Sequence, residues 1–266
     1  MHPLTARNKN KKEIFKMIES IRNNQKLQNT LEFLAKSKWM DLIGIVIIIV
    51  GAGLAGWFTE TLDVVNKNAG AWGWLPFGLI STFAGCLSLW SDRLDSRMNK
   101  LTNWVSLFQT LLAMWIDYQL GNKACWTYLI TFAIYLFATY RWSHTEDQKT
   151  AKPLTGTKKY VVATITIIAA VAFSLFANYL GFHNFSLLYW LTSAVFAMSL
   201  IANVYSALKL DTQFGYWQVY NLLQIAKYGF AMNAVAIPQL IKYIYYLINV
   251  TAGQAYWRVR HPEENN

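Results

Sequence analysis

The sequence predicts an all-α polytopic membrane protein with about eight transmembrane helices. Of its 266 residues, 55% are hydrophobic and only 14% are charged, which is more apolar and less charged than a typical soluble domain. The charges are also segregated, so that long runs lack Lys, Arg, Asp and Glu. Three such runs are Leu42–Trp57, Tyr160–Leu180 and Leu187–Ala202, and each is about long enough to cross the bilayer core.

The N-terminal segment is polar and basic. Residues 1–38 hold nine Lys or Arg, and apolar residues such as Ile14, Ile18 and Ile21 recur at helical spacing. This pattern predicts an amphipathic helix on an anionic membrane face. A secretory signal is excluded because the first apolar run starts near residue 40 and is long enough to span.

The predicted spans cover 41–59, 73–91, 103–120, 124–141, 160–180, 186–207, 215–231 and 236–257. With the N-terminus in the cytoplasm, the cytoplasmic segments hold twenty Lys or Arg, whereas the outer loops hold only Lys67 and Lys123. This asymmetry follows the positive-inside rule and predicts cytoplasmic N- and C-termini. It also explains the net charge of +10 as a consequence of membrane topology. No nucleic acid is therefore expected as a partner.

An internal repeat is indicated by matched residues at a nearly constant offset. The matched pairs are Trp74/Trp190, Asp95/Asp211, Ser91/Ser206, Gln109/Gln224 and Trp142/Trp257, which are 115 or 116 residues apart. Two three-helix copies joined by one linking span have the same orientation, a parallel 3+1+3 arrangement like that of the SWEET carriers. The predicted division is a basic amphipathic segment (1–40), an extra span with its outer loop (41–72), the first repeat (73–142), a cytoplasmic loop with the linking helix (143–185), the second repeat (186–258) and a tail (259–266).

The first span is rich in small residues. Gly44, Gly51, Gly53, Ala55 and Gly56 predict close helix packing or a role in assembly. Only Pro76 and Pro238 touch spans, each within a first turn where proline is tolerated. Unbroken helices favour rocking of two rigid three-helix bundles.

The stretch Trp217–Tyr228 is the strongest candidate for a binding site. Polar groups in hydrocarbon are costly unless they face a bundle interior or a ligand. At helical spacing, one face of this span carries Trp217, Asn221, Gln224 and Tyr228. Aromatic rings beside carboxamides suit a flat, polar molecule that is uncharged or weakly charged, although hydrogen-bonded helix packing explains the same pattern.

Further candidates come from the other spans. Gln109 is a deep amide in the first copy, and Tyr220 adds a second ring for stacking on a flat ligand. Tyr128 in the fourth span, and Tyr246 and Asn249 in the last, belong to polar stripes that fit either a substrate path or a packing seam. The candidates for a gate or entrance are Trp190, Asn203, Tyr205, Lys227 and Lys242.

Several classes of function are excluded. The four histidines fall in tails or loops, and no nucleophile–base arrangement appears, so the chain is not predicted to be an enzyme. No phosphate-binding loop is present, and Cys86 and Cys125 form no metal pattern, so no cofactor or metal is expected. A chain of intramembrane carboxylates, as expected of a proton relay, is also lacking from the predicted spans, where Asp117 is the main candidate and is expected to be interfacial.

Residues 73–257 resemble the PnuC-type vitamin transporters in their 3+1+3 architecture, basic linker loop and aromatic-rich halves. That family carries a Trp-x-x-Trp feature near a carboxamide in the penultimate span. Here the stretch reads Trp217-Gln218-Val219-Tyr220-Asn221, so that Tyr220 replaces the second Trp. The endings Arg141-Trp142 and Tyr256-Trp257 also fit the way that the repeats close.

The resemblance implies uptake of nicotinamide riboside for NAD biosynthesis, by facilitated diffusion with alternating access, in the bacterial cytoplasmic (inner) membrane. It also implies a cytosolic riboside kinase that traps the product, and a homo-oligomer such as a trimer. The alternatives are another flat vitamin (thiamine or riboflavin), a SWEET-like sugar carrier, or a structural membrane protein whose polar stripes are packing seams.

Overall fold

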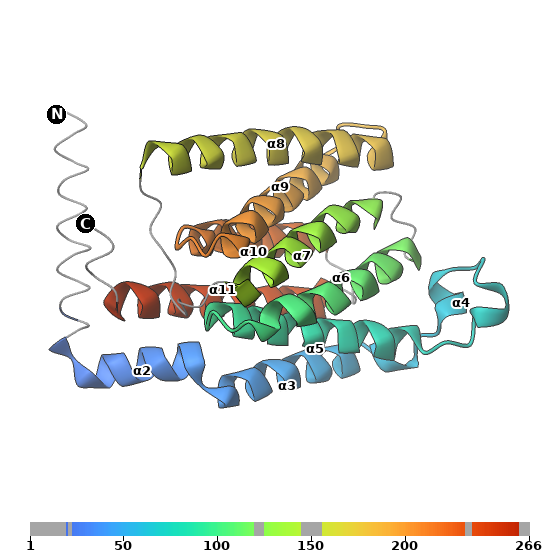
Figure 1. The fold of residues 1–266 in the computed structure, drawn as a ribbon. Coiled ribbons are helices and arrows are strands. Elements are labelled where there is room, and N and C mark those ends of the chain that lie inside the picture. The colour runs from blue at the N-terminus through green and yellow to red at the C-terminus, as the bar shows by residue number, and fades with distance from the viewer. Residues whose placement is uncertain (1–19, 21–22, 120–124, 145–155, 232–235, 261–266) are drawn as a thin grey trace.

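The described part of the chain folds into a bundle of long helices (Figure 1). The computed structural model describes residues 20, 23–119, 125–144, 156–231 and 236–260. Its longer helices are α2 (Gln25–Lys36), α3 (Lys38–Leu54), α5 (Phe77–Ser96), α6 (Leu101–Gln119), α7 (Tyr128–His144), α8 (Thr157–Phe182), α9 (Leu187–Ala207), α10 (Gln213–Ala231) and α11 (Ala236–Arg260). The short pieces η1 (Trp57–Thr59), α4 (Leu62–Val65) and η2 (Gly70–Trp72) lie between α3 and α5, and η3 (Cys125–Thr127) precedes α7.

The predicted spans correspond to α3 and α5–α11, with shifted ends. Helix α3 ends at Leu54 rather than at residue 59, because Gly56 adopts a left-handed conformation (φ 68°) that interrupts the helix. Helix α5 continues to Ser96, five residues beyond the predicted end at 91. That extension moves Asp92 and Asp95 from a predicted loop into a helix.

Length and composition alone identify two of the described helices as candidate spans, Tyr160–Phe182 and Leu187–Ala207. The pair α2 and α3, bent by 54°, counts as a third if it is one span. The remaining long helices are more polar; α5, for example, contains Asp92, Arg93 and Asp95. Because these helices pack against one another, their polar faces have partners inside the bundle.

Two groups of three helices make up the centre of the bundle. Helices α5, α6 and α7 pack in chain order, and so do α9, α10 and α11. The last helix of each group also packs against the first helix of the other group, since α7 contacts α9 and α11 contacts α5. Helix α8 packs on α9 at one side of the bundle (Figure 1).

Two tryptophans make reciprocal contacts between these groups. Trp142 of α7 donates its indole N–H to the carbonyl of Ala207 (3.2 Å), and Trp257 of α11 donates to that of Ser96 (2.9 Å). Ser96 and Ala207 are the last residues of α5 and α9. The third helix of each group, near its C-terminal end, therefore contacts the last residue of the other group's first helix.

The spacing of equivalent positions is not constant along the two groups. The ends of α5 and α9 are 111 residues apart, and the positive-φ residues that follow, Met98 and Lys209, are also 111 apart. The two tryptophans are 115 apart. Measured from the helix ends, Asp95 corresponds to Ser206 and not to Asp211, which lies in the turn after α9.

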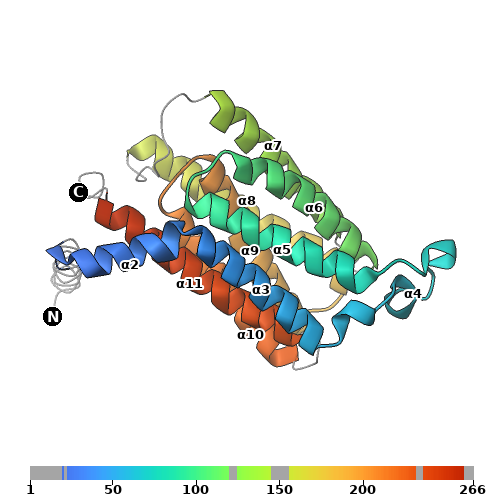
Figure 2. The same cartoon turned by 90° about the horizontal axis from the view of Figure 1, so that it is seen from below.

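The N-terminal helices lie against one side of this bundle (Figure 2). Helix α3 packs on α5 and α11, and a Cβ at Gly44 would lie 2.5 Å from Leu89 and 2.8 Å from Tyr245. Close helix packing at Gly44 is therefore confirmed. Helix α2 also packs on α11, where Lys36 lies 4.6 Å from the Tyr256 ring centroid. Most of the predicted amphipathic segment lies outside the described residues.

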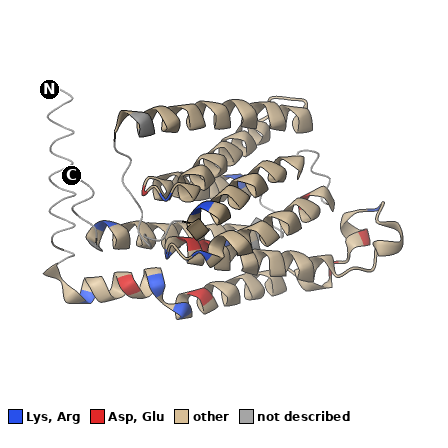
Figure 3. Ribbon diagram, in the orientation of Figure 1, with Lys and Arg blue, Asp and Glu red and all other residues tan. Residues whose placement is uncertain are grey.

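Charged side chains are unevenly distributed over the described helices (Figure 3). They gather toward the end of the bundle where α2 begins and α11 ends, and they reappear in the α4 region at the other end. One prediction about them was wrong. Arg93 was counted among loop cations, but it lies in α5 and is fully buried.

Candidate functional site

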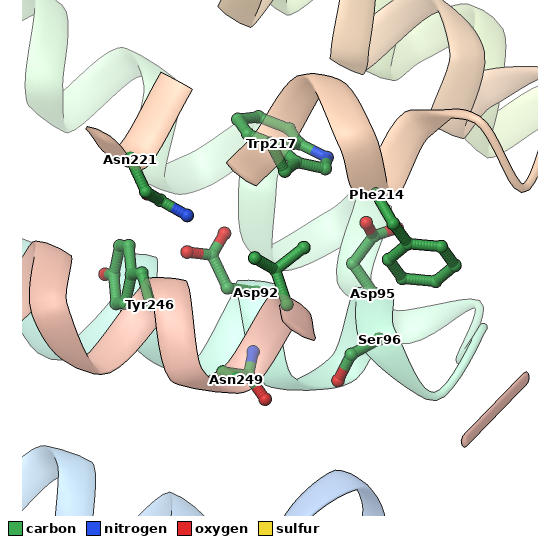
Figure 4. A pocket seen from close by; sticks show the side chains of 9 residues that line it. Asp92, Asp95, Ser96, Phe214, Trp217, Asn221, Tyr246 and Asn249 are labelled. Carbon is green, nitrogen blue, oxygen red and sulfur yellow. The ribbon is translucent and has the colours of Figure 1, made fainter. Parts of the chain in front are cut away.

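A polar pocket lies where α5, α10 and α11 meet (Figure 4). It is lined by Asp92, Asp95, Ser96, Phe214, Trp217, Asn221, Tyr246, Asn249 and Val250. The cavity measures about 30 Å³, which is room for only a few water molecules. A ligand the size of a nucleoside therefore requires the surrounding helices or side chains to move apart.

Helical periodicity explains why these residues converge. Side chains three and four residues apart share one face of a helix. Each of the three helices contributes such a set: Asp92, Asp95 and Ser96 from α5, Phe214, Trp217 and Asn221 from α10, and Tyr246, Asn249 and Val250 from α11. The pocket is thus built on rigid elements from both three-helix groups.

Two carboxylates give the pocket its charge. Asp95 accepts a hydrogen bond from the Ser206 hydroxyl of α9 at 2.8 Å. Asp92 interacts electrostatically with Lys242 of α11, whose ammonium lies 4.6 Å from the Tyr243 ring centroid. No Lys or Arg is among the described residues that line the pocket. The pocket therefore favours a cation over an anion.

Helices α5 and α6, which correspond to predicted spans, hold three carboxylates. Asp92 and Asp95 lie within α5 and Asp117 lies within α6. Asp117 accepts a hydrogen bond from the Tyr128 hydroxyl at 3.1 Å and interacts electrostatically with Lys227. Asp117 already lay within the predicted span 103–120, but Asp92 and Asp95 were missed because the first charge after residue 91 was taken as the start of a loop, whereas α5 continues to Ser96.

Several buried polar atoms around the pocket have no hydrogen-bond partner in the described part of the chain. They include the indole nitrogen of Trp217, the amide oxygen of Asn221 and the amide oxygen of Gln224. An unpaired buried polar group costs roughly 1–3 kcal/mol. A ligand that supplies donors and acceptors here would remove that cost, so these atoms favour a binding site over a packing seam.

An aromatic cluster adjoins the pocket on the α10–α11 side. Tyr220 accepts a hydrogen bond from Gln224 Nε2 at 2.9 Å, and its ring meets Trp217 edge-on with centroids 5.3 Å apart. Its ring also lies near that of Tyr243, 5.9 Å away. Tyr220 and Gln224 are thus neighbours of the pocket rather than part of its lining.

Four of the eight predicted substrate-binding residues line the pocket: Trp217, Asn221, Tyr246 and Asn249. Tyr220 and Gln224 adjoin it, as described above. Tyr128 bonds to Asp117, and Gln109 is half-buried on α6 outside the lining. The structure thus brings together the candidates from α10 and α11, but not those from the first group.

The five gate candidates are spread through the fold. Trp190 is 51% exposed and packs against Phe185 and Tyr189, as expected of a lipid-facing aromatic side chain. Asn203 and Tyr205 are buried in α9. Lys227 and Lys242 both lie over tyrosine rings, and Lys242 is close enough to interact with Asp92.

The residues missed by sequence reasoning are Asp92, Asp95, Ser96, Phe214 and Val250. A signal for the α5 set was present, since Asp92, Asp95 and Ser96 have helical spacing directly after an apolar run. Phe214 and Val250 carried no such signal, because apolar residues in apolar helices look alike whether they face lipid or a pocket.

One comparison with known proteins identifies a family, and a second identifies a fold. Residues 75–259 match the family model described as "Nicotinamide mononucleotide transporter". A solved structure described as the crystal structure of the vitamin B3 transporter PnuC has the same fold, with a TM-score of 0.55 at 16% identity. That match covers 81% of this chain and 90% of the other. A search of curated proteins found no significant match.

Proposed function

We propose that this chain, which belongs to the nicotinamide mononucleotide transporter family, takes up nicotinamide riboside by facilitated diffusion. As a member of that family it is a multi-pass membrane transporter of vitamin B3 and not an enzyme. The observation that carries the choice of substrate is the pocket in which Asp92 and Asp95 lie beside Trp217.

The chemistry of this pocket suits the riboside better than its phosphate ester. The pyridinium ring is a flat cation, which carboxylates attract and an aromatic face stabilises by about 0.5–2 kcal/mol. The mononucleotide adds a phosphate that Asp92 and Asp95 would repel. Lys242 interacts with Asp92 but does not itself line the described pocket, so the riboside is the proposed substrate.

Hydrogen-bonding groups complete the proposed site. The ligand carboxamide and ribose hydroxyls offer both donors and acceptors, which match the amides of Asn221 and Asn249. Gln224 and Tyr220 would contribute from the adjoining cluster. Tyr246 closes the α11 side with its ring.

Transport in this proposal proceeds by rocking of two three-helix repeats related by a parallel duplication. The cavity of about 30 Å³ is smaller than a nucleoside, so the proposal requires the surrounding helices or side chains to move apart when the substrate enters. The positive-inside count supports cytoplasmic termini in the bacterial inner membrane. A cytosolic kinase would trap the product, and the working unit is proposed to be a homo-oligomer.

Calorimetric titration of the purified chain tests this proposal. Nicotinamide riboside should bind saturably, the mononucleotide should not, and the reduced riboside, which is nearly isosteric but uncharged, should bind at least tenfold more weakly. Asn221→Ala should weaken riboside binding, whereas Asp63→Asn, at an exposed outer-loop carboxylate, should not. Equal binding of the charged and reduced ribosides would refute the role of the carboxylates.

Thiamine is the second candidate, because it too is a flat cation that the two carboxylates would attract. Riboflavin and sugars are uncharged, so they would bring no positive charge to balance the carboxylates of Asp92 and Asp95. Saturable thiamine binding without riboside binding would keep the cation site and replace the substrate.

A further inference from the structure

Arg93 lies next to Asp92 in α5 but extends away from the pocket, toward α2 and α3. Its side chain is fully buried, and its donors are satisfied on that side. Nε donates to Asp41 of α3 at 2.7 Å, Nη1 to the Leu34 carbonyl at 2.7 Å and Nη2 to the Ser37 carbonyl at 3.1 Å. A buried guanidinium with a carboxylate and two carbonyls is held in one orientation.

The bend between α2 and α3 makes these carbonyls available. Ser37 has extended backbone dihedrals (φ −64°, ψ 133°), so it ends α2, and its hydroxyl caps α3 by accepting from the Trp39 N–H at 3.1 Å. A helix end leaves carbonyls without intrahelical partners. Arg93 binds two carbonyls at this 54° bend, which is called the α2–α3 elbow below.

The same guanidinium also reaches a residue of the pocket. Arg93 Nη1 donates to Oδ1 of Asn249 on α11. Because arginine only donates hydrogen bonds, this contact assigns the amide oxygen of Asn249 to the side of Arg93. The amide nitrogen then lies on the side of the pocket, as Figure 4 shows.

We propose that Arg93, held by Asp41 and the α2–α3 elbow, is a positioning residue that aims the N–H₂ group of Asn249 into the substrate site. The site would then require an oxygen acceptor on the ligand at this point, such as a ribose hydroxyl or the carboxamide oxygen. The identity of that ligand rests on the proposed function. The elbow lies outside the matched residues 75–259, so the inference makes the N-terminal helices part of the site.

Two conservative variants test this inference. Arg93→Lys keeps the charge for Asp41 but cannot hold Asp41, the elbow carbonyls and Asn249 at once. Arg97→Lys is the matched control, because Arg97 also donates to Asp41 and to the Ser37 carbonyl, while its hydrogen bonds in the described part of the chain do not include Asn249. Binding would be measured for the riboside and for its 2′-deoxy, 3′-deoxy and thioamide analogues.

The wild-type chain should prefer the riboside to the analogue that lacks the acceptor by about tenfold, the value of one well-formed hydrogen bond. Arg93→Lys should reduce that preference to about threefold or less and leave binding of the analogue unchanged. Arg97→Lys should keep the full preference. Should Arg93→Lys fail to fold, Asn249→Asp keeps a partner for Arg93 but removes the donor, and it should abolish the preference.

Equal loss of riboside and analogue binding in Arg93→Lys would assign Arg93 a structural role only and overturn the inference. So would an unchanged preference in Asn249→Asp. A double-mutant cycle of thermal unfolding, with Arg93→Lys, Asn249→Ala and the double variant, needs no ligand. If the stability losses of the two single variants add up to that of the double variant, the two side chains do not interact and the inference is overturned. Failure of the wild-type chain to bind riboside, with coupling present in that cycle, would instead overturn the proposed function.

Discussion

The reciprocal tryptophan contacts make a sharp prediction about stability. Trp257→Phe and Trp142→Phe each keep an aromatic ring but remove the indole N–H that bonds to the last carbonyl of α5 or α9. These carbonyls have no partner within their own helices. Each variant therefore leaves a helix-end carbonyl unpaired between the two three-helix groups.

The magnitude follows from burial. Trp142 is fully buried and Trp257 is 9% exposed, so water does not readily replace either indole. A lost hydrogen bond that leaves a buried acceptor unpaired costs about 1–3 kcal/mol, and the smaller ring adds a cavity cost. We expect each variant to lower the free energy of unfolding by about 2 kcal/mol, with similar values for both.

Thermal or denaturant unfolding in detergent checks this expectation, with Trp190→Phe as the control. Trp190 is 51% exposed, so that variant should change stability by less than about 0.5 kcal/mol. If either buried variant is as stable as the control, the indole contact does not hold the groups together. A large effect of one buried variant and none of the other would refute the reciprocity.

Three other predictions concern the pocket and the packing of α3. Asp92→Asn should weaken riboside binding about tenfold or more by calorimetry while the reduced riboside is unaffected, because the neutral amide no longer attracts a cation. Trp217→Leu should weaken binding of both ribosides, with the larger loss for the cation, since a stacking face is lost as well as a cation–π contact. Gly44→Val should lower the unfolding free energy by about 1–3 kcal/mol in denaturant titrations, because its side chain would overlap Leu89 and Tyr245.

The number and order of the long helices were predictable because apolar runs of membrane length are a strong signal. The predicted span 103–120 and the observed α6 (Leu101–Gln119) illustrate how closely such runs mark a helix. Helix ends were harder to predict. The charges that follow residue 91 resemble a loop in composition, but in the fold they occupy the last turns of α5 with partners on two sides.

Polar residues in apolar helices were easy to identify in the sequence, but the role of each one was not. Trp217, Asn221 and Asn249 line the pocket, but Gln109 and Asn203, which look similar in sequence, lie elsewhere. An amide in a span indicates only that a hydrogen-bond partner is needed, from another helix or from a ligand. Which partner it has depends on how neighbouring helices pack, and that arrangement is set by contacts far apart in the sequence, such as Arg93 with Asn249.

The order of charges in α5 links the pocket to the N-terminal helices. Residues 92–97 place Asp92 and Asp95 on the pocket face and Arg93 and Arg97 on the face toward α3. Helix α3 also contacts α11, so it joins a helix of each three-helix group along one seam. In the proposed rocking motion, α3 would hold α5 and α11 together along this seam. The α7–α9 seam has no corresponding contact with α3 among the element contacts described, so the two seams would not open equally even though their tryptophan contacts match.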